Sequence, residues 1–376
     1  MVVSITKMMT RRTVLKSSFA ATAFVGLNLK ATADADQNSG AGSNGYRYID
    51  EAAPHARTFM QWPVNRDVHP ETDFLIWLQQ TIAKTANSIA DFEPVVMLMA
   101  QEHQTAARKL LSAKVEIWDV STDDLWCRDS GPHFVSNGKS LGVSQLNFNG
   151  WGNKQTHDND GKISATIAER LGLPVFNNGV VGEAGGIEAN GEGLLLAHES
   201  SWINPNRNSG SKDEISSKLL EAYGAKKIIW APGIIGADIT DYHIDSLARL
   251  IDAKTVLIQM PEQPNPEDPW SVAAFETLAV LESETNAEGE KLIFEKLPEP
   301  VKIRSKSADF VAAYANYYIC NGAIIGAQFG DKDTDEESAS TLKRLYPNRE
   351  IIQLNIDAIG EIGGGIHCAT HEQPEV

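Results

Sequence analysis

The sequence of 376 residues predicts a single α/β domain that extends from residue 46 to residue 376. Along this stretch, segments with apolar residues at helical spacing alternate with short runs rich in β-branched residues, which is typical of repeated β and α units. No break in composition divides the stretch into two parts. Hydrophobic residues make up 42% of the chain, so there is enough apolar material for a large core.

Six segments are predicted to be helical because their apolar residues recur every three or four positions. The longest comprises residues 74–92, in which Leu78, Ile82 and Ile89 share one face. The other five predicted helices are residues 102–113, 163–171, 213–223, 272–284 and 336–346.

Short apolar runs between these segments are predicted to be buried strands. Residues 317–327 are expected to form a hairpin, because Asn321 and Gly322 make a dipeptide that favours tight turns. No glycine-rich phosphate-binding motif follows the first strand, so a nucleotide-binding sheet is not supported. The other predicted strands are residues 94–99, 115–120, 227–230, 255–260, 292–297 and 350–356.

Residues 1–35 are interpreted as a signal peptide of the twin-arginine type. Arg11 and Arg12 precede an apolar run at residues 17–29, and small residues follow at 31–33. An amphipathic helix or a membrane anchor is the alternative, but the run is shorter than the roughly 20 residues that a spanning helix needs. The twin-arginine export machinery is therefore an expected partner, and the expected location is periplasmic or secreted.

Residues 36–45 are expected to form a flexible tether, because they are polar and rich in Gly and Ser.

The formal charge of the chain is −17, and residues 1–35 carry +4 of opposite sign, so the remainder carries −21. An acidic body of this kind repels nucleic acid and mildly attracts cations. The three cysteines Cys127, Cys320 and Cys368 are an odd number and lie far apart, so they do not form a disulfide framework. At least one of them is unpaired within the chain.

Four polar clusters interrupt the apolar pattern and carry the groups that could do chemistry: residues 123–132 (DDLWCRDSGP), 182–193 (GEAGGIEANGEG), 240–249 (TDYHIDSLAR) and 363–374 (GGGIHCATHEQP). In the last cluster, three glycines allow a ligand to approach the main chain next to Cys368, which could act as a nucleophile. Burial as a small apolar residue is the common alternative for a lone cysteine. A metal site made of His367, Cys368 and His371 is a second alternative, but zinc would need further ligands.

The other clusters hold ionisable groups that could serve a hydrolase. His243 and Asp245 lie two positions apart, so an extended segment would place an imidazole and a carboxylate on one face, as a general acid and base requires. Asp129 lies at a turn, where it could face a cleft or pair with a neighbouring arginine. Trp126 could line a pocket for a cation or fill the core. Glu183 could likewise have either a catalytic or a structural role.

Read together, these clusters resemble the agmatine deiminase family, which includes the bacterial type of peptidylarginine deiminase and belongs to the guanidino-modifying superfamily. The likeness extends from about residue 46 to residue 374. The motifs that carry it, in order, are APHARTFMQWP near the start, DLWCRDSGP, EAGGIEANGEG followed by INPNRN, TDYHIDSLAR, FGD and GGGIHCATHEQP.

The resemblance implies a five-bladed α/β propeller, or pentein-like fold, with the active site where the blades converge. Asp129, Glu183 and His243 recur at intervals of 54 and 60 residues, which is compatible with repeated units. By the resemblance, Cys368 is the nucleophile, His243 the acid and base, and Asp129 and Asp245 the carboxylates that bind the guanidinium. Glu183 supports the histidine, and Trp126 and Gly365 are expected to contact the substrate.

The reaction implied by the resemblance is hydrolysis of agmatine to N-carbamoylputrescine and ammonia, a step of polyamine synthesis, through a covalent thiouronium on Cys368 and without a cofactor or metal. Tyr242, Asn190 and Leu250 depart from the family pattern, which has Gly, an acidic residue and Phe at these positions. Tyr242 is expected to change the shape of the pocket.

The alternatives to an agmatine deiminase are an exported peptidylarginine deiminase and a non-catalytic binding protein for guanidino ligands. Members of this family often form dimers, so a homodimer is a further expectation.

Overall fold

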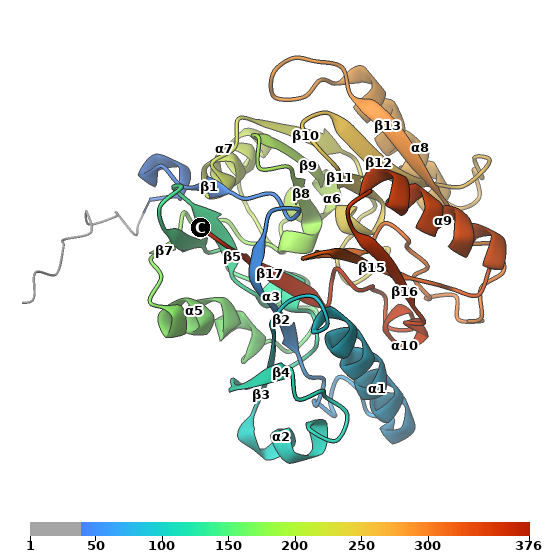
Figure 1. Ribbon diagram of the computed structural model, residues 1–376. Coiled ribbons are helices and arrows are strands. Elements are labelled where there is room, and N and C mark those ends of the chain that lie inside the picture. Colours follow the sequence, from blue (N-terminus) through green and yellow to red (C-terminus); the bar gives the residue numbers. More distant parts are fainter. Residues whose placement is uncertain (1–38) are drawn as a thin grey trace, which may run out of the picture. The chain divides into compact units, whose positions relative to one another are not determined.

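The computed structural model describes residues 39–376, and within this part of the chain the strands form five small sheets (Figure 1). Each sheet contains two antiparallel strands, followed by a helix and by a strand that pairs in parallel with the second one. A parallel neighbour requires such a crossover, and a helix supplies it in every case. Each unit is one blade, so the predicted five-bladed α/β propeller is confirmed.

Blade 1 comprises β1 (Arg47–Tyr48), β5 (His133–Ser136), β6 (Leu141–Ser144), β7 (Val175–Phe176) and the helices α4 (Gly150–Asn153) and α5 (Asp160–Leu171). Blade 2 comprises β8 (Ile187–Ala189), β9 (Leu194–His198), β10 (Lys227–Ala231), α6 (Glu199–Trp202) and α7 (Lys212–Tyr223). Blade 3 comprises β11 (Ala248–Leu250), β12 (Thr255–Met260), α8 (Pro269–Ser283) and β13 (Ile293–Pro298). Blade 4 comprises β14 (Tyr318–Cys320), β15 (Ala323–Ala327), α9 (Lys332–Leu345) and β16 (Glu350–Leu354).

Blade 5 joins the two ends of the described chain. Its C-terminal strand β17 (Thr370–Pro374) pairs antiparallel with β2 (His55–Gln61), with Thr370 opposite Met60. The blade continues through α1 (Thr72–Ile89), β3 (Val95–Met99), α2 (Gln101–Ala107) and β4 (Val115–Asp119). Since β17 directly follows the Cys368 segment, closing the ring also places the candidate nucleophile.

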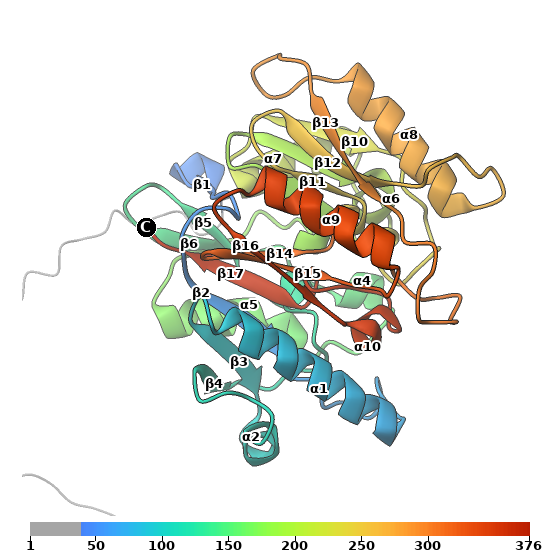
Figure 2. The ribbon, with the colours of Figure 1, turned by 45° about the vertical axis from the view of Figure 1, so that its right-hand side comes forward.

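Short helical turns lead into the first strand of several blades. They are α3 (Cys127–Ser130) before β5, η2 (Ala184–Gly186) before β8, η3 (Ile244–Ser246) before β11 and α10 (Asp357–Gly360) before the Cys368 segment. Helices α1, α8 and α9 lie on the outside of the molecule, as the two ribbon views agree (Figures 1 and 2).

The helices and strands expected from the sequence are all present, with small shifts at their ends. The expected hairpin is formed by β14 and β15, and Gly322 in its turn has a φ of 81°, a conformation that favours glycine. One helix is shorter than expected, because α2 ends at Ala107 instead of residue 113. There the Arg108 guanidinium donates to the carbonyl of Ser112 at 3.0 Å and stabilises a turn that buries Leu111 in the core.

The predicted flexible tether, residues 36–45, lies partly within the described residues, and its flexibility stays a prediction. Residues 42–44 form the short helix η1 (Gly42–Asn44), which contacts α7. Ala41 is fully buried, and its carbonyl accepts a hydrogen bond from the amide of Tyr46 at 2.9 Å. The predicted signal peptide, residues 1–35, lies outside the described residues.

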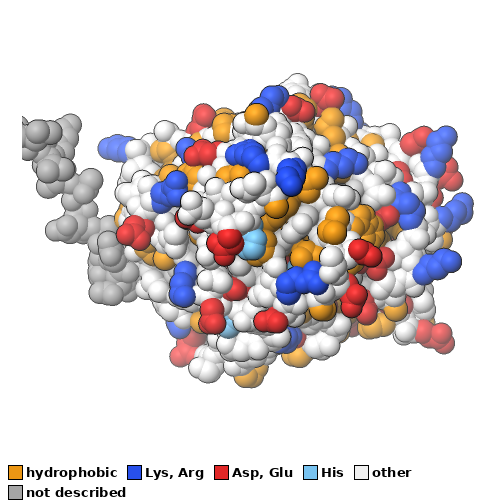
Figure 3. All heavy atoms as spheres, turned by 90° about the horizontal axis from the view of Figure 1, so that it is seen from below, with side chains coloured by type: hydrophobic (Ala, Val, Ile, Leu, Met, Phe, Trp, Pro, Cys, Tyr) orange, Lys and Arg blue, Asp and Glu red, His pale blue; other side chains and the backbone are white. Residues whose placement is uncertain are grey.

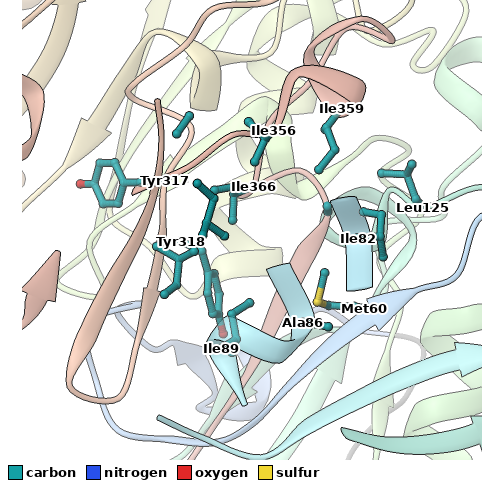
Figure 4. Packing of buried hydrophobic residues seen from close by; sticks show 14 of the residues in the cluster. Met60, Ile82, Ala86, Ile89, Leu125, Tyr317, Tyr318, Ile356, Ile359 and Ile366 are labelled. Atoms are coloured by element: carbon teal, nitrogen blue, oxygen red, sulfur yellow. The ribbon is translucent and has the colours of Figure 1, made fainter. Parts of the chain in front are cut away.

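The largest buried cluster fills the space between α1, α10 and the β14–β15 hairpin (Figure 4). Ile82 and Ile89 from α1 reach it, and each fully buried side chain of this type stabilises the fold by about 1.5–3 kcal/mol. Leu125 and Ile366 also belong to the cluster, and each lies close in sequence to a candidate site residue. The core therefore anchors the segments that carry Trp126 and Cys368.

On the face shown in Figure 3, basic and acidic side chains are interspersed, and apolar side chains gather near its centre. No single sign of charge covers this face. Among residues 39–376, no helix has both the length and the apolar character needed to cross a bilayer.

Candidate active site

The predicted site residues occupy equivalent positions in successive blades, in the turns that lead into each first strand. Asp129 lies in α3 ahead of β5, Glu183 precedes η2 and β8, His243 precedes η3 and β11, and Cys368 precedes β17. Residues that are far apart in sequence are thus brought together at the ring centre.

Blade 4 contributes a residue that the sequence analysis did not identify. Asn316 lies two positions before β14 and is 1% exposed, and its side chain contacts Cys368. The spacing of the motifs could have indicated such a residue, because Cys368 follows His243 by about two repeat units and leaves room for one more site segment between them. The residues around Asn316 do not otherwise indicate a role in the site.

Hydrogen bonds and one ionic contact join the five site segments into a closed ring. Each joins one blade to the next, and the last returns to the first. Taken in order, they join Asp129 to Gly185, Glu183 to His243, Arg249 to Tyr317, Asn316 to Cys368, and Cys368 to Arg128.

Cys368 is the one partly exposed cysteine among the three, since Cys127 and Cys320 are buried. The Asn316 side chain donates from Nδ2 to its Sγ at 3.1 Å and accepts from its backbone amide at 3.2 Å. Its thiol lies 3.4 Å from Oδ2 of Asp245. The thiol is therefore held in a fixed orientation beside a carboxylate.

The alternative of a metal site at His367, Cys368 and His371 is not supported by their placement. The ring of His371 is turned away, and its Nε2 lies 2.6 Å from the carbonyl of Pro132. In the part of the chain that the structure describes, no group of three or more His, Cys, Asp or Glu side chains is arranged to hold a metal ion.

His243 lies between two carboxylates. Its Nε2 is 3.2 Å from Oε2 of Glu183, and its Nδ1 is 3.7 Å from Oδ1 of Asp129. Glu183 is in turn held by the Arg207 guanidinium at 2.9 Å, a contact that the sequence analysis missed although Arg207 lies in the INPNRN motif. His243 and Asp245 were expected on one extended face. A short 3₁₀ helix, η3, begins directly after His243 instead.

Gly185 lies where three of the predicted side chains converge. A Cβ atom on this residue would lie 2.7 Å from Oδ1 of Asp129, 2.8 Å from Nδ1 of His243 and 3.3 Å from Oδ2 of Asp245. Carbon and polar atoms do not approach this closely, so only glycine leaves room for the three groups. The backbone amide of Gly185 also donates to Oδ1 of Asp129 at 3.2 Å.

Trp151 is a second site neighbour that the sequence analysis missed. Its indole Nε1 donates to Oδ2 of Asp129 at 2.9 Å, and it lies in the distorted turn α4, where Trp151 and its two neighbouring glycines all have positive φ. The sequence feature that could have indicated its role is the glycine on each side of the tryptophan. The contact fixes the orientation of the Asp129 carboxylate.

The glycine run before Cys368 allows close packing against two side chains. A Cβ atom on Gly364 would lie 2.4 Å from the ring of Trp126, and one on Gly365 would lie 2.4 Å from Oδ1 of Asn316. Trp126 is buried in the largest core cluster, so it supports the Cys368 segment. Substrate contacts by Trp126 and Gly365 remain predictions.

Tyr242, the bulky departure next to His243, has a φ of 70° and a buried ring. The ring packs between His198 and Trp270, with ring centroids 4.5 and 4.8 Å away. A left-handed backbone costs a non-glycine residue about 1 kcal/mol or more, which this packing offsets. The tyrosine therefore sets the backbone ahead of His243 while its ring fills the interior of blades 2 and 3.

The sequence model of the family described as Porphyromonas-type peptidyl-arginine deiminase matches residues 47–374, nearly all of the described chain. This chain belongs to that family. It is 31% identical over 338 residues to a Streptomyces coelicolor protein and 30% identical over 366 residues to one from Selenomonas ruminantium, both named "Putative agmatine deiminase". The two alignments cover 88% and 89% of this chain, and 99% and 97% of the relatives.

Solved structures of agmatine deiminases have the same fold. The enzyme of Enterococcus faecalis superposes with a TM-score of 0.83 at 25% identity, covering 90% of this chain and 98% of that one. A Cys-to-Ser variant of the C. jejuni agmatine deiminase with substrate bound gives 0.78 at 27% identity, covering 88% and 96%. The family consists of guanidino-modifying enzymes, and this chain is one of its members.

In this deiminase-family protein, the carboxylates around His243 control its charge. Burial alone would lower the pKa of His243, but Asp129 and Glu183 raise it to about 9. Burial raises the pKa of Asp129 to about 6, although the charge of His243 opposes the shift. At neutral pH the imidazole is therefore protonated and the Asp129 carboxyl is largely ionised.

The surroundings of the Cys368 thiol favour its neutral form. Burial, together with the carboxylates of Asp245 and Asp129, raises its pKa well above the usual value, while hydrogen bonds from Gly365 and Asn316 act in the opposite direction. A cation placed between the two carboxylates would cancel their effect and favour the thiolate.

These shifts predict a bell-shaped dependence of kcat/KM on pH, measured by ammonia release. Activity rises through about pH 6 as Asp129 ionises, and falls through about pH 9 as His243 loses its proton. Activity that kept rising beyond pH 9 would contradict a protonated His243 as the acid.

Replacement of Asn316 by alanine is expected to raise the pKa of the Cys368 thiol, because the side-chain donor to Sγ is lost. Loss of a donor to a developing oxyanion lowers kcat by roughly 10²-fold, and we expect a fall of up to this order for a donor to the thiolate. Thiolate absorbance at 240 nm as a function of pH measures the titration directly. Asn190→Ala is the matched control, since Asn190 is also a buried turn asparagine but contacts only its own turn and Asp252. Equal titration curves for the two variants would rule out a role of Asn316 at the thiol.

Proposed function

We propose that this protein hydrolyses agmatine to N-carbamoylputrescine and ammonia, with Cys368 as the nucleophile and without a cofactor. The observation that carries the proposal is the convergence of Asp129, Asp245 and His243 around Gly185, with the thiol of Cys368 3.4 Å from Oδ2 of Asp245. Two buried carboxylates at one point suit a cation. The proposal is further supported by the names of relatives that match nearly the whole chain.

The first step is binding of the guanidinium between the two carboxylates. A guanidinium presents pairs of N–H donors, and carboxylates orient it through forked hydrogen bonds. Asp245 accepts from His367 at Oδ2, while its Oδ1 is buried and has no hydrogen-bond partner among the described residues. Oδ1 is therefore the atom of Asp245 assigned to the substrate.

The second step is attack of the Cys368 thiolate on the central guanidinium carbon. A C–S bond forms, a C–N bond breaks, and the imidazolium of His243 gives its proton to the departing ammonia. The resulting S-alkylthiouronium keeps the rest of the substrate bound. Neutral His243 then takes a proton from water, whose oxygen adds to the same carbon. The C–S bond then breaks while the added hydroxyl gives its proton to solvent, which releases a neutral ureido product and the thiolate.

Agmatine is favoured over free arginine because the basic side chains around the site are already paired with acidic ones. A substrate with a free carboxylate would need an unpaired cation, yet each nearby cation already has an acidic partner. The pairs are Arg128 with Glu51 and Glu372, Arg249 with Glu51 and Glu188, Arg207 with Glu183 and Asp241, and Lys154 with Asp241. A decarboxylated substrate makes no such demand.

Arginine within a peptide is the second candidate substrate, because the matching family model carries the name of a peptidylarginine deiminase and a peptide also lacks a free carboxylate at that residue. Incubation of the mature protein with agmatine, free arginine and a short arginine peptide separates the candidates. We expect ammonia and ureido product from agmatine alone. Turnover of the peptide but not of agmatine would overturn the choice of substrate.

Cys368→Ser is expected to abolish turnover while it still binds agmatine, because a serine hydroxyl is a far weaker nucleophile than a thiolate. Cys320→Ser is the matched control, since Cys320 is buried in β14 away from the site and should keep its activity. Tight binding of agmatine without turnover by the unmodified protein would favour a binding protein for guanidino ligands instead.

We also propose that residues 1–35 direct the protein out of the cytoplasm through the twin-arginine machinery, because Arg11 and Arg12 precede a short apolar run. In a bacterium with that machinery, the full chain should be found in the periplasmic fraction by immunoblot. Replacement of both arginines by lysine should retain it in the cytoplasm. Equal distribution of the two forms would contradict the proposal.

A further inference from the structure

His367, the residue before the nucleophile, has no part in the reaction steps above, yet it is bound at both ring nitrogens. Its ring is 1% exposed. Nδ1 lies 2.8 Å from Oδ2 of Asp245, and Nε2 lies 2.8 Å from Oε1 of Glu51. A neutral imidazole can donate from one nitrogen only, whereas two ionised carboxylates each require a donor.

The charged groups that face His367 come from four segments. Asp245 approaches from η3, and Glu51 from the segment that precedes β2. Two cations also lie near: Arg128 of α3, whose Nε is 3.4 Å from the carbonyl of His367, and Arg249 of β11, which contacts Glu51 at 2.6 Å. Each of these arginines has a second acidic partner, Glu372 and Glu188 respectively, so the two carboxylates of His367 are not fully neutralised by them.

We propose that His367 is a positioning residue for deimination, held as a doubly protonated imidazolium that fixes the Asp245 carboxylate and keeps it ionised for the guanidinium. The kinetic part of this inference rests on the proposed function. The charge of the ring can be measured without any substrate.

The contact with His367 determines which atom of Asp245 faces the substrate. His367 and the Cys368 thiol both lie against Oδ2, at 2.8 and 3.4 Å, so Oδ1 is left as the free acceptor. A carboxylate without this constraint could rotate or take up a proton, and it would then present a poorer acceptor to the substrate.

The electrostatics of the cluster agree with this geometry. Burial and the two arginines would lower the pKa of His367, but Glu51 and Asp245 outweigh them and raise it. Burial would raise the pKa of Asp245, but the hydrogen bond and charge of His367 lower it. Each group thus favours the charged form of the other.

The first test is nuclear magnetic resonance of the unmodified protein with ¹⁵N-labelled histidine. The His367 signals are assigned by their loss in His367→Gln. We expect both ring nitrogens of His367 to remain protonated at pH 8, where an unperturbed histidine, with a pKa of about 6.5, is neutral. A neutral ring at pH 8 would overturn the proposal, whatever the kinetics show.

The second test compares His367→Gln with His367→Asn. Gln can still donate to Glu51 but not to Asp245, whereas Asn can still donate to Asp245 without the charge. For His367→Gln we expect KM for agmatine to rise and kcat/KM at pH 7 to fall by roughly tenfold or more, the equivalent of one pKa unit. Because Asp245 would ionise at a higher pH, part of this loss should be regained between pH 7 and pH 8.5. The loss in His367→Asn should be smaller.

His69→Asn is the matched control, because His69 contacts Asp124 through Nε2 at 2.8 Å, a contact that the shorter asparagine side chain does not reach. It should lower thermal stability to a similar extent and leave the pH profile unchanged. A loss in His367→Gln that is independent of pH, or no larger than that of His69→Asn, would reduce His367 to a structural role. Absence of turnover by the unmodified protein would instead overturn the proposed function and leave the resonance result standing.

Discussion

The hydrogen bonds of the buried Glu51 carboxylate are the interaction that holds the segments at the centre of the propeller together. Its Oε1 accepts from Arg128 at 2.9 Å and from His367 at 2.8 Å, and its Oε2 accepts from Arg249 at 2.6 Å. The three donors belong to blade 1, blade 5 and blade 3. A buried carboxylate is tolerated only when its charge is matched, and here burial is outweighed by the cations, which lower the pKa of Glu51 well below its usual range. One side chain thus holds three site segments at fixed distances.

A consequence of this arrangement is that the two carboxylates nearest the thiol have no arginine partner. The arginines of the centre are used to bind Glu51, Glu372 and Glu188, so Asp129 and Asp245 face the thiol without an arginine of their own. Burial and mutual repulsion raise the pKa of Asp129 to about 6, and both carboxylates raise the pKa of Cys368. A guanidinium bound between these carboxylates would offset their effect on the thiol. On the proposed mechanism, binding energy from the cation would thereby help to ionise Cys368, which would tie its reactivity to the presence of the substrate.

The sequence predicted most of the fold because its signals are local. Helix α1 and the β14–β15 hairpin follow directly from apolar spacing and from the dipeptide Asn321–Gly322. Asp129, Glu183, His243, Asp245 and Cys368 were identified because each lies in a dense polar motif. Asn316 and Glu51 were missed for the opposite reason: each is a single polar residue in an ordinary segment, and its role arises only when the ring closes. The contact of η1 with α7 could not be predicted for a related reason, since it depends on packing rather than on composition.

The contacts of His367 and Cys368 explain why the proposed nucleophile is preceded by glycines and by a histidine. The two consecutive side chains serve different partners: His367 contacts Glu51 and Asp245, and Cys368 contacts Asn316 and Asp245. A tight turn is needed to present both, and Gly364 and Gly365 allow it because Trp126 and Asn316 occupy the space where a Cβ atom would stand. Asp245 is the residue common to both contacts. Its Oδ2 faces the thiol and the imidazole, and its Oδ1 has no hydrogen-bond partner among the described residues, so the orientation of a single carboxylate links the buried charge network to the Cys368 thiol.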